Sequence, residues 1–160
     1  MDREIVRVAE IRTGQGSGKL LALGLGSCVA IILWDPATRI GGMAHVLLPA
    51  PPPRHLDVPA GRYAQTAVPE LLRRMLQAGA DRSAIGARLV GGAAMFANLI
   101  APGLIHSGER NVLASRHALH AAGLPLQREW VGEDFGRSVE FDLATGRVVA
   151  SSVRHGARDL

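Results

Sequence analysis

Residues 23–48 read LGLGSCVAIILWDPATRIGGMAHVLL, and this stretch decides the fold. Two apolar runs, 29–34 and 39–48, are rich in residue types that favour β-strands. Between them lies Asp35-Pro36-Ala37-Thr38, which has the composition of a turn. The stretch therefore predicts an antiparallel β-hairpin.

The length of the turn predicts which residues face each other across the hairpin. If a four-residue loop sets Trp34 opposite Arg39, the same register sets Cys28 opposite His45. Directly opposed side chains have Cβ atoms about 4.5–5.5 Å apart, so the thiol would reach the imidazole. A slip of one residue, or a bulge at Gly41-Gly42, would change this geometry.

Cys28 and His45 together have the chemistry of a nucleophile and its base, because an imidazole that takes the thiol proton produces a thiolate. Gly24, Gly26 and Ser27 would form the loop whose N–H groups hold an oxyanion or contact the substrate. The alternative is structural. A single cysteine or histidine is often a packed core residue, and glycine runs often mark plain turns.

The rest of the chain alternates between strand and helix patterns. Gly91, Gly92 and Ala93 follow a predicted strand, and their small size allows close approach to a neighbouring strand or to a substrate. The proline-rich segment 49–61 either borders a substrate groove near His45 or is a connector. The predicted strands are 4–11, 20–23, 87–90, 126–131, 138–141 and 147–153, and the predicted loops are 14–18 and 142–146. Two helices are predicted. The first covers 62–78, with a possible bend at Pro69, and the second covers 111–122, with Asn111 as N-cap.

Composition limits the class of protein. A chain of 160 residues with 48% hydrophobic content is sufficient for a single domain, 1–160, with one real core. The single cysteine excludes an internal disulfide. We expect no membrane span or insertion, because the sequence has no apolar stretch of about 18 residues. We also expect no secretory signal before the first strand. We therefore expect a cytoplasmic location.

The charge pattern argues against nucleic acid as a partner. The net charge is +4 and the pI is near 10.5, but the arginines are dispersed and aromatic residues make up only 4%. Such a surface is better suited to steering toward an acidic protein. His106, His117 and His120 lack the neighbouring ligands of a metal site, and we expect neither a metal nor another cofactor.

Several motifs in a fixed order resemble one known family. GLGSCV, MAHVLLP, GGAAMF, GERN and, near the C-terminus, Phe135-Gly136-Arg137 follow one another as they do in the CheD family, the chemoreceptor glutamine deamidases of bacterial chemotaxis. The resemblance covers nearly the whole chain. It implies an α/β fold, a single-domain sandwich of mixed, largely antiparallel β-sheets flanked by about two main helices. It also implies that Cys28 is the nucleophile and His45 its base.

The resemblance further implies a reaction and its partners. The thiolate would attack the carboxamide of a receptor glutamine, release ammonia, and leave a thioester that water hydrolyses to glutamate. The substrate would be the cytoplasmic helical bundle of methyl-accepting chemoreceptors. Some family members also bind a CheC-type phosphatase.

The sequence departs from the family at one position of the catalytic set. The family has a threonine just before the glycine run, and this chain has Ala22. Thr13, Ser107 or a main-chain carbonyl would then have to orient His45. Two other functions stay open. One, suggested by this difference, is a catalytically weakened adaptor that binds receptors or a CheC-type phosphatase, and the other is a different cysteine hydrolase.

Overall fold

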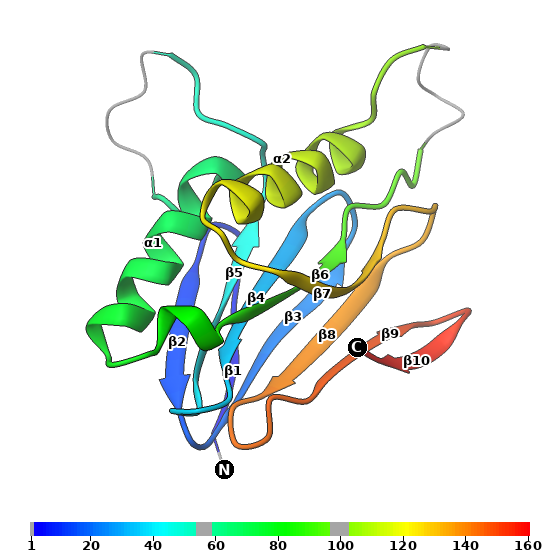
Figure 1. Ribbon diagram of the computed structural model, residues 1–160. Coiled ribbons are helices and arrows are strands. Elements are labelled where there is room, and N and C mark those ends of the chain that lie inside the picture. Colours follow the sequence, from blue (N-terminus) through cyan, green and yellow to red (C-terminus); the bar gives the residue numbers. More distant parts are fainter. Residues whose placement is uncertain (1, 54–58, 97–102) are drawn as a thin grey trace.

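A computed structural model describes residues 2–53, 59–96 and 103–160, and these residues form three layers (Figure 1). Two five-stranded sheets stack on each other, and two α-helices cover the outer face of one sheet. The elements are β1 Arg3–Ile5, β2 Ile11–Gln15, β3 Lys19–Leu25, β4 Val29–Asp35, β5 Ile40–Val46, α1 Ala64–Gln77, a short 3-10 turn Arg82–Ala84, β6 Gly86–Gly91, α2 Ser107–Ala121, β7 Leu126–Val131, β8 Arg137–Asp142, β9 Val148–Ser152 and β10 Gly156–Asp159.

The sheet order confirms the predicted fold class. The sheet under the helices has the order β2-β5-β4-β6-β7, and the second sheet has the order β1-β3-β8-β9-β10. Within the described residues, β1 pairs with β3 and β6 with β7 in parallel, and the other pairs are antiparallel. The fold is thus an α/β sandwich of mixed, largely antiparallel sheets. In the described ranges, no helix is long and apolar enough to cross a membrane.

Strand β4 is buried along its whole length and contributes to two cores. Val29, Ile31 and Leu33 pack toward the helices, whereas the alternate residues, such as Trp34, pack between the two sheets. Trp34 meets Phe141 of β8 edge to face, with ring centroids 5.7 Å apart. This double burial explains why the strand reads as a continuous apolar run without polar alternation.

The predicted hairpin exists, but its predicted register is wrong. Asp35 pairs with Ile40, and Ala30, not Cys28, pairs with His45. The loop is 36–39, one residue further along than predicted. Asp35 is the last residue of β4, and its carboxylate accepts hydrogen bonds from Ala37 and Thr38 of the loop. A bulge at 41–42 is not the cause of the difference, since the ladder between β4 and β5 runs without a shift from one end to the other.

The predicted first strand, 4–11, is two strands. β1 ends at Ile5 and belongs to one sheet, β2 begins at Ile11 and belongs to the other, and the chain crosses between the sheets over 6–10. Ala9 has φ +70°, a backbone conformation that continuous strands do not use. The alternation of Val6 and Val8 with charged residues predicts one continuous strand, but the segment contributes to both sheets.

The second helix begins earlier than predicted, at Ser107 and not at Asn111. His106 is its N-cap, and Asn111 lies one turn inside with its side chain fully buried. Gly108 lies in the first turn of this helix, where a Cβ would collide with the backbone of Gly92 and Ala93, so glycine is needed for this close approach.

The remaining predicted elements are confirmed to within three residues. The first helix, α1, runs unbroken through Pro69. The strands predicted at 20–23, 87–90, 126–131, 138–141 and 147–153 correspond to β3, β6, β7, β8 and β9, and the loop at 142–146 lies between the last two. Strand β10 was not predicted. Part of the proline-rich segment, 54–58, lies outside the described residues.

Replacing Asp35 by alanine should destabilise the fold by about 2–4 kcal/mol, measured by urea unfolding at neutral pH. The buried carboxylate accepts hydrogen bonds from Ala37 N (2.8 Å), Thr38 Oγ1 (2.6 Å) and Asp81 N (2.8 Å). Asp142→Ala is the matched control, because that turn carboxylate accepts one such bond, from Ala144 N. An equal loss in both variants would contradict the assigned role.

The effect of Asp35→Ala should also depend on pH. Burial raises the pKa of this carboxyl, but the hydrogen bonds together outweigh burial and leave the pKa below its ordinary value of 3.8. The stabilisation is therefore present above that value and is lost as the pH falls through the lowered pKa. The difference between Asp35→Ala and the unchanged chain should shrink below about pH 4.

Candidate active site

Cys28 lies in the short connection between β3 and β4, at one end of the inter-sheet core. Its side chain is half-buried and packs against that core. The carbonyls of Gly26, Ser27 and Cys28 all accept hydrogen bonds from the protein behind them. The donors are Ala93 N (2.8 Å), Asn111 Nδ2 (2.9 Å) and Gly92 N (2.8 Å), respectively. The loop that carries the thiol is therefore fixed at three successive residues.

The segment 91–93, predicted to face a neighbouring strand or a substrate, packs directly behind this loop. Gly91, Gly92 and Ala93 are buried. Gly91 has φ +115°, and a Cβ there would overlap the carbonyl oxygen of Cys28. Only glycine permits this approach, so the small residues keep the Cys28 loop close to β6.

His45 lies on β5 with its side chain only 5% exposed and directed into the space between the sheets. Its Nδ1 is 2.9 Å from the carbonyl oxygen of Val6. The backbone of His45 is held by the same crossing, through Ala9 N to His45 O (2.8 Å) and His45 N to Glu10 O (3.1 Å). The segment 6–10 therefore fixes both the ring and the main chain of this histidine.

The contact with Val6 assigns the proton on the neutral imidazole. A carbonyl only accepts hydrogen bonds, so Nδ1 must be the protonated nitrogen. The other nitrogen, Nε2, then carries the lone pair, and it has no hydrogen-bond partner among the described residues. The ring is thus oriented with its basic nitrogen unoccupied.

Cys28 and His45 belong to the same side of the sheet, but they are not directly opposed. Ala30 faces His45, and Cys28 lies two residues earlier, which is a diagonal position. Diagonal neighbours in a hairpin are about 7–8 Å apart at Cα. Within the described part of the chain, no hydrogen bond joins the thiol to the imidazole.

The thiol is neutral in this arrangement. Burial raises the pKa of Cys28 above its ordinary value of 9.0, and the backbone N–H of Cys28 itself offsets only part of this effect. Within residues 2–53, 59–96 and 103–160, no arginine or lysine contributes to this shift of the pKa. A preformed pair of thiolate and imidazolium is therefore not what the resting geometry favours.

The three loop residues predicted to supply oxyanion donors differ in availability. The N–H of Gly24 donates to Ser138 Oγ at 3.0 Å. The N–H groups of Gly26 and Ser27 have no partner among the described residues. The carbonyls of Gly26 and Ser27 are bound to the protein behind the loop, so these two N–H groups are donors without a partner beside the thiol, in addition to the N–H of Cys28 that contacts the thiol itself.

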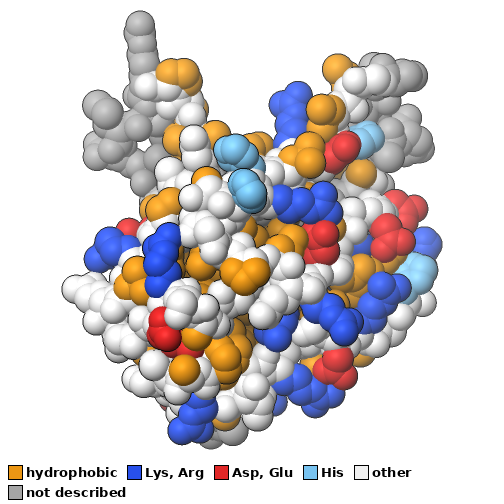
Figure 2. All heavy atoms as spheres, in the orientation of Figure 1, with side chains coloured by type: hydrophobic (Ala, Val, Ile, Leu, Met, Phe, Trp, Pro, Cys, Tyr) orange, Lys and Arg blue, Asp and Glu red, His pale blue; other side chains and the backbone are white. Residues whose placement is uncertain are grey.

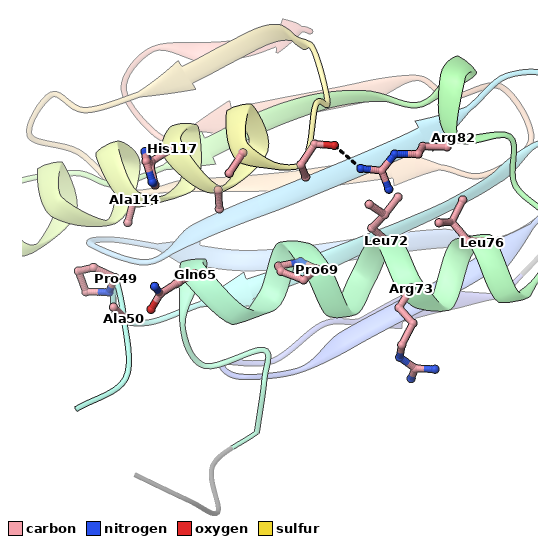
Figure 3. A pocket seen from close by; sticks show the side chains of 13 residues that line it. Pro49, Ala50, Gln65, Pro69, Leu72, Arg73, Leu76, Arg82, Ala114 and His117 are labelled. Atoms are coloured by element: carbon pink, nitrogen blue, oxygen red, sulfur yellow. Dashed lines mark hydrogen bonds between the residues drawn. The ribbon is translucent and has the colours of Figure 1, made fainter. Parts of the chain in front are cut away.

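Two of the hollows on the surface are relevant to a site for a protein substrate. A groove of about 650 Å³ runs between α1 and α2 and is lined by Pro49, Pro69, Leu72, Leu76 and Ala118, among others (Figure 3). On this helical face, hydrophobic side chains are interspersed with basic ones (Figure 2). Neither Cys28 nor His45 lines the groove.

The second hollow, of about 480 Å³, borders the glycine run. Gly24, Met95 and Phe135 line it together with the β9–β10 turn, where Val153 is fully exposed. Met95 also lies over Gly26, with its sulfur 3.2 Å from where a Cβ would be. Cys28 and His45 do not line this hollow either, but Gly24 and Met95 place it beside the loop that carries Cys28.

Two contributors to the site were not identified from the sequence. Val6 acts through its main chain, so its residue type gives no signal. Asn111 lies in the GERN motif, and a buried asparagine on the inner face of a helix would have been the signal, but it was interpreted as a cap. Thr13 and Ser107 do not hydrogen-bond the His45 ring, and the main-chain carbonyl does.

The geometry defines a class of protein: a three-layer α/β/β domain with a half-buried thiol and an oriented imidazole at one end of its inter-sheet core. Comparison with known proteins gives the family. A family model described as CheD chemotactic sensory transduction matches residues 47–152. The chain belongs to the CheD family.

Similar proteins cover almost the whole chain. "Probable chemoreceptor glutamine deamidase CheD" of Caldanaerobacter subterraneus subsp. tengcongensis is 34% identical over 99% of both chains. "Probable chemoreceptor glutamine deamidase CheD 2" of Geobacter metallireducens is 38% identical over 97% of this chain and 96% of its own. The CheD protein of Methanococcus maripaludis is 44% identical over 83% and 82%, respectively.

The neutral His45 ring should carry its proton on Nδ1. Nitrogen-15 NMR of the histidine-labelled protein at alkaline pH would show a protonated Nδ1 and an unprotonated Nε2 for this residue, because the Val6 carbonyl accepts from Nδ1. His45→Gln identifies the signal by its loss. A ring protonated on Nε2 would contradict the hydrogen bond to Val6.

Alkylation of Cys28 by iodoacetamide should reach half its maximal rate above pH 9.0, because burial raises the pKa of the thiol. The urea-unfolded chain is the matched control, and its half-maximal rate should come at a lower pH. A folded-state midpoint below that of the unfolded chain would show that a cation activates the resting thiol.

Proposed function

We propose that this protein is a chemoreceptor glutamine deamidase in which Cys28 is the nucleophile and His45 the general base. Membership of the CheD family supports the reaction. The single structural observation that carries the assignment is the His45 ring, held by the Val6 carbonyl so that Nε2 is the basic nitrogen. A histidine with only a packing role has no reason to keep Nε2 without a hydrogen-bond partner, whereas a general base needs that nitrogen available.

In the first half of the reaction, His45 Nε2 takes the proton of the neutral thiol as the sulfur attacks the carboxamide carbon of a glutamine. The carbonyl oxygen becomes an oxyanion, and the free N–H groups of Gly26 and Ser27 donate to it. The protonated His45 then gives its proton to the departing nitrogen. The C–N bond breaks, ammonia leaves, and a thioester on Cys28 remains.

In the second half, His45 removes a proton from water, which attacks the thioester carbon. The C–S bond breaks, the sulfur regains the proton, and glutamate is released. The same residues therefore act in both halves with reversed proton transfer.

A third group is needed to hold the imidazole in the productive tautomer. The resemblance assigns this role to a threonine where this chain has Ala22. We assign it here to the Val6 carbonyl, which lies 2.9 Å from Nδ1. Ala22 packs in the same inter-sheet cluster as Val6, and Val6 N donates to the carbonyl of Leu21, the residue before Ala22 (2.7 Å).

The proposed substrate is the cytoplasmic helical bundle of methyl-accepting chemoreceptors, which places the protein in the cytoplasm. A net charge of +4 assists association with an acidic bundle. The hollow beside Gly24 and Met95 is the surface where a receptor helix would bring its glutamine to Cys28. A CheC-type phosphatase is a further proposed partner, on the resemblance alone.

Incubation with a chemoreceptor cytoplasmic fragment should increase the fragment mass by about 1 Da per converted glutamine. Cys28→Ala and His45→Ala should each reduce the rate by at least about 1,000-fold without unfolding the domain. Mass spectrometry of the fragment gives the rate, and circular dichroism gives the folded state.

Ser83→Ala is the control, because that hydroxyl lies in the 3-10 turn and donates to the Asp81 carboxylate, away from the thiol, the imidazole and the hollow. Conversion that persists in Cys28→Ala would show that the nucleophile is wrongly assigned. A folded chain that binds the fragment but converts nothing would be the adaptor. Hydrolysis of small esters without conversion of the fragment would indicate a different cysteine hydrolase.

A further inference from the structure

Asn111 occupies an unusual position for an amide side chain. It lies in the second turn of α2, is completely buried, and faces the sheet, away from solvent. Its Nδ2 donates two hydrogen bonds of 2.9 Å, one to the carbonyl of Ser27 and one to the carbonyl of Leu47. The two acceptors are far apart in sequence and belong to different segments.

Both acceptors are next to the proposed catalytic residues. Ser27 immediately precedes Cys28, and Leu47 is two residues beyond His45 at the end of β5. One amide nitrogen therefore joins the loop that carries the thiol to the segment that follows the imidazole. Among the described residues, no other single side chain donates to both segments.

We propose that Asn111 is a positioning residue that sets the distance and orientation of Cys28 relative to His45; this inference rests on the proposed deamidase function. Cys28 and His45 are diagonal neighbours without a direct hydrogen bond, so the strand ladder alone does not hold them in contact. The approach of sulfur to Nε2 then depends on how firmly the Cys28 loop is held. Asn111 fixes that loop from the helix layer.

The chemistry of the side chain suits this role. An asparagine NH₂ group has two donors on one atom, whereas aspartate has none and serine has one. The remaining atom, Oδ1, is buried and has no partner among the described residues. A buried acceptor without a partner is unfavourable, and an apolar side chain would avoid it. The site therefore uses the two donors despite this cost.

Docking of α2 does not depend on Asn111 alone. Gly108 packs against the backbone of Gly92 and Ala93, and Val112 and Leu119 belong to the core between the helices and the sheet. Removing the amide should therefore leave the helix in place and loosen the Cys28 loop at Ser27, while the main-chain bonds from Gly92 and Ala93 to Cys28 and Gly26 remain. This separation makes the proposal testable.

The test compares Asn111→Ala with Ser115→Ala. Ser115 is also fully buried, one turn further along α2, but its hydroxyl donates only to the carbonyl of Asn111 in its own helix. With the receptor fragment as substrate, Asn111→Ala should lower kcat by about 10- to 100-fold and leave KM within about threefold. Ser115→Ala should leave kcat within about twofold.

A second readout does not need the receptor. Released from Asn111, the half-buried Cys28 should react with iodoacetamide at least about fivefold faster in folded Asn111→Ala, with no change in Ser115→Ala. Circular dichroism and the urea midpoint confirm that each variant is folded. If Asn111→Ala does not fold, Asn111→Ser, which keeps one donor, is measured in the same way and should show an intermediate effect.

The outcomes separate the two proposals. If the unchanged protein does not convert the fragment, the proposed function fails, and the alkylation rates alone decide the role of Asn111. Unchanged kcat and alkylation in a folded Asn111 variant would overturn the positioning role. A loss in Ser115→Ala equal to that in Asn111→Ala would overturn it too, because the effect would then belong to the helix as a whole.

Discussion

Strand β4 has no face exposed to solvent, and both cores of the molecule are built on it. One side packs against α1 and α2, and the other packs against the second sheet. This constraint places the N-terminal end of β4 where three layers meet. Cys28 immediately precedes that end, so groups from the helix layer, from β6 and from the inter-sheet core all reach the loop that carries it.

The site follows from this position because burial and hydrogen bonding, and not nearby cations, set its chemistry. Burial raises the pKa of Cys28, and among the described residues no arginine or lysine opposes this effect. A thiol of this kind reacts only when a base removes its proton during attack. An imidazole whose Nδ1 is already bound to a carbonyl has the basic nitrogen available for that step. The two observations therefore describe one mechanism.

The sequence predicted the elements better than their connections. Apolar periodicity identified the helices and most strands, because burial imposes that periodicity directly. It did not identify the break at 6–10, since alternating valines look the same whether a strand continues in one sheet or crosses to another. The register was wrong because Asp35 belongs to the strand, which depends on hydrogen bonds that no residue pattern specifies. Asn111 was expected at a cap because asparagine is a common N-cap residue, whereas the cap is His106 and the asparagine lies inside the helix.

The same crossing explains how the site accommodates Ala22. A threonine at this completely buried position would need a partner for its hydroxyl. The Val6 carbonyl is already committed to Nδ1 of His45. Alanine adds no competing donor, so the carbonyl keeps a single strong partner. An orienting group supplied by the main chain is fixed by the path of residues 6–10, and it persists whatever side chain occupies position 6. Loss of the threonine and retention of an oriented imidazole are therefore compatible in this chain.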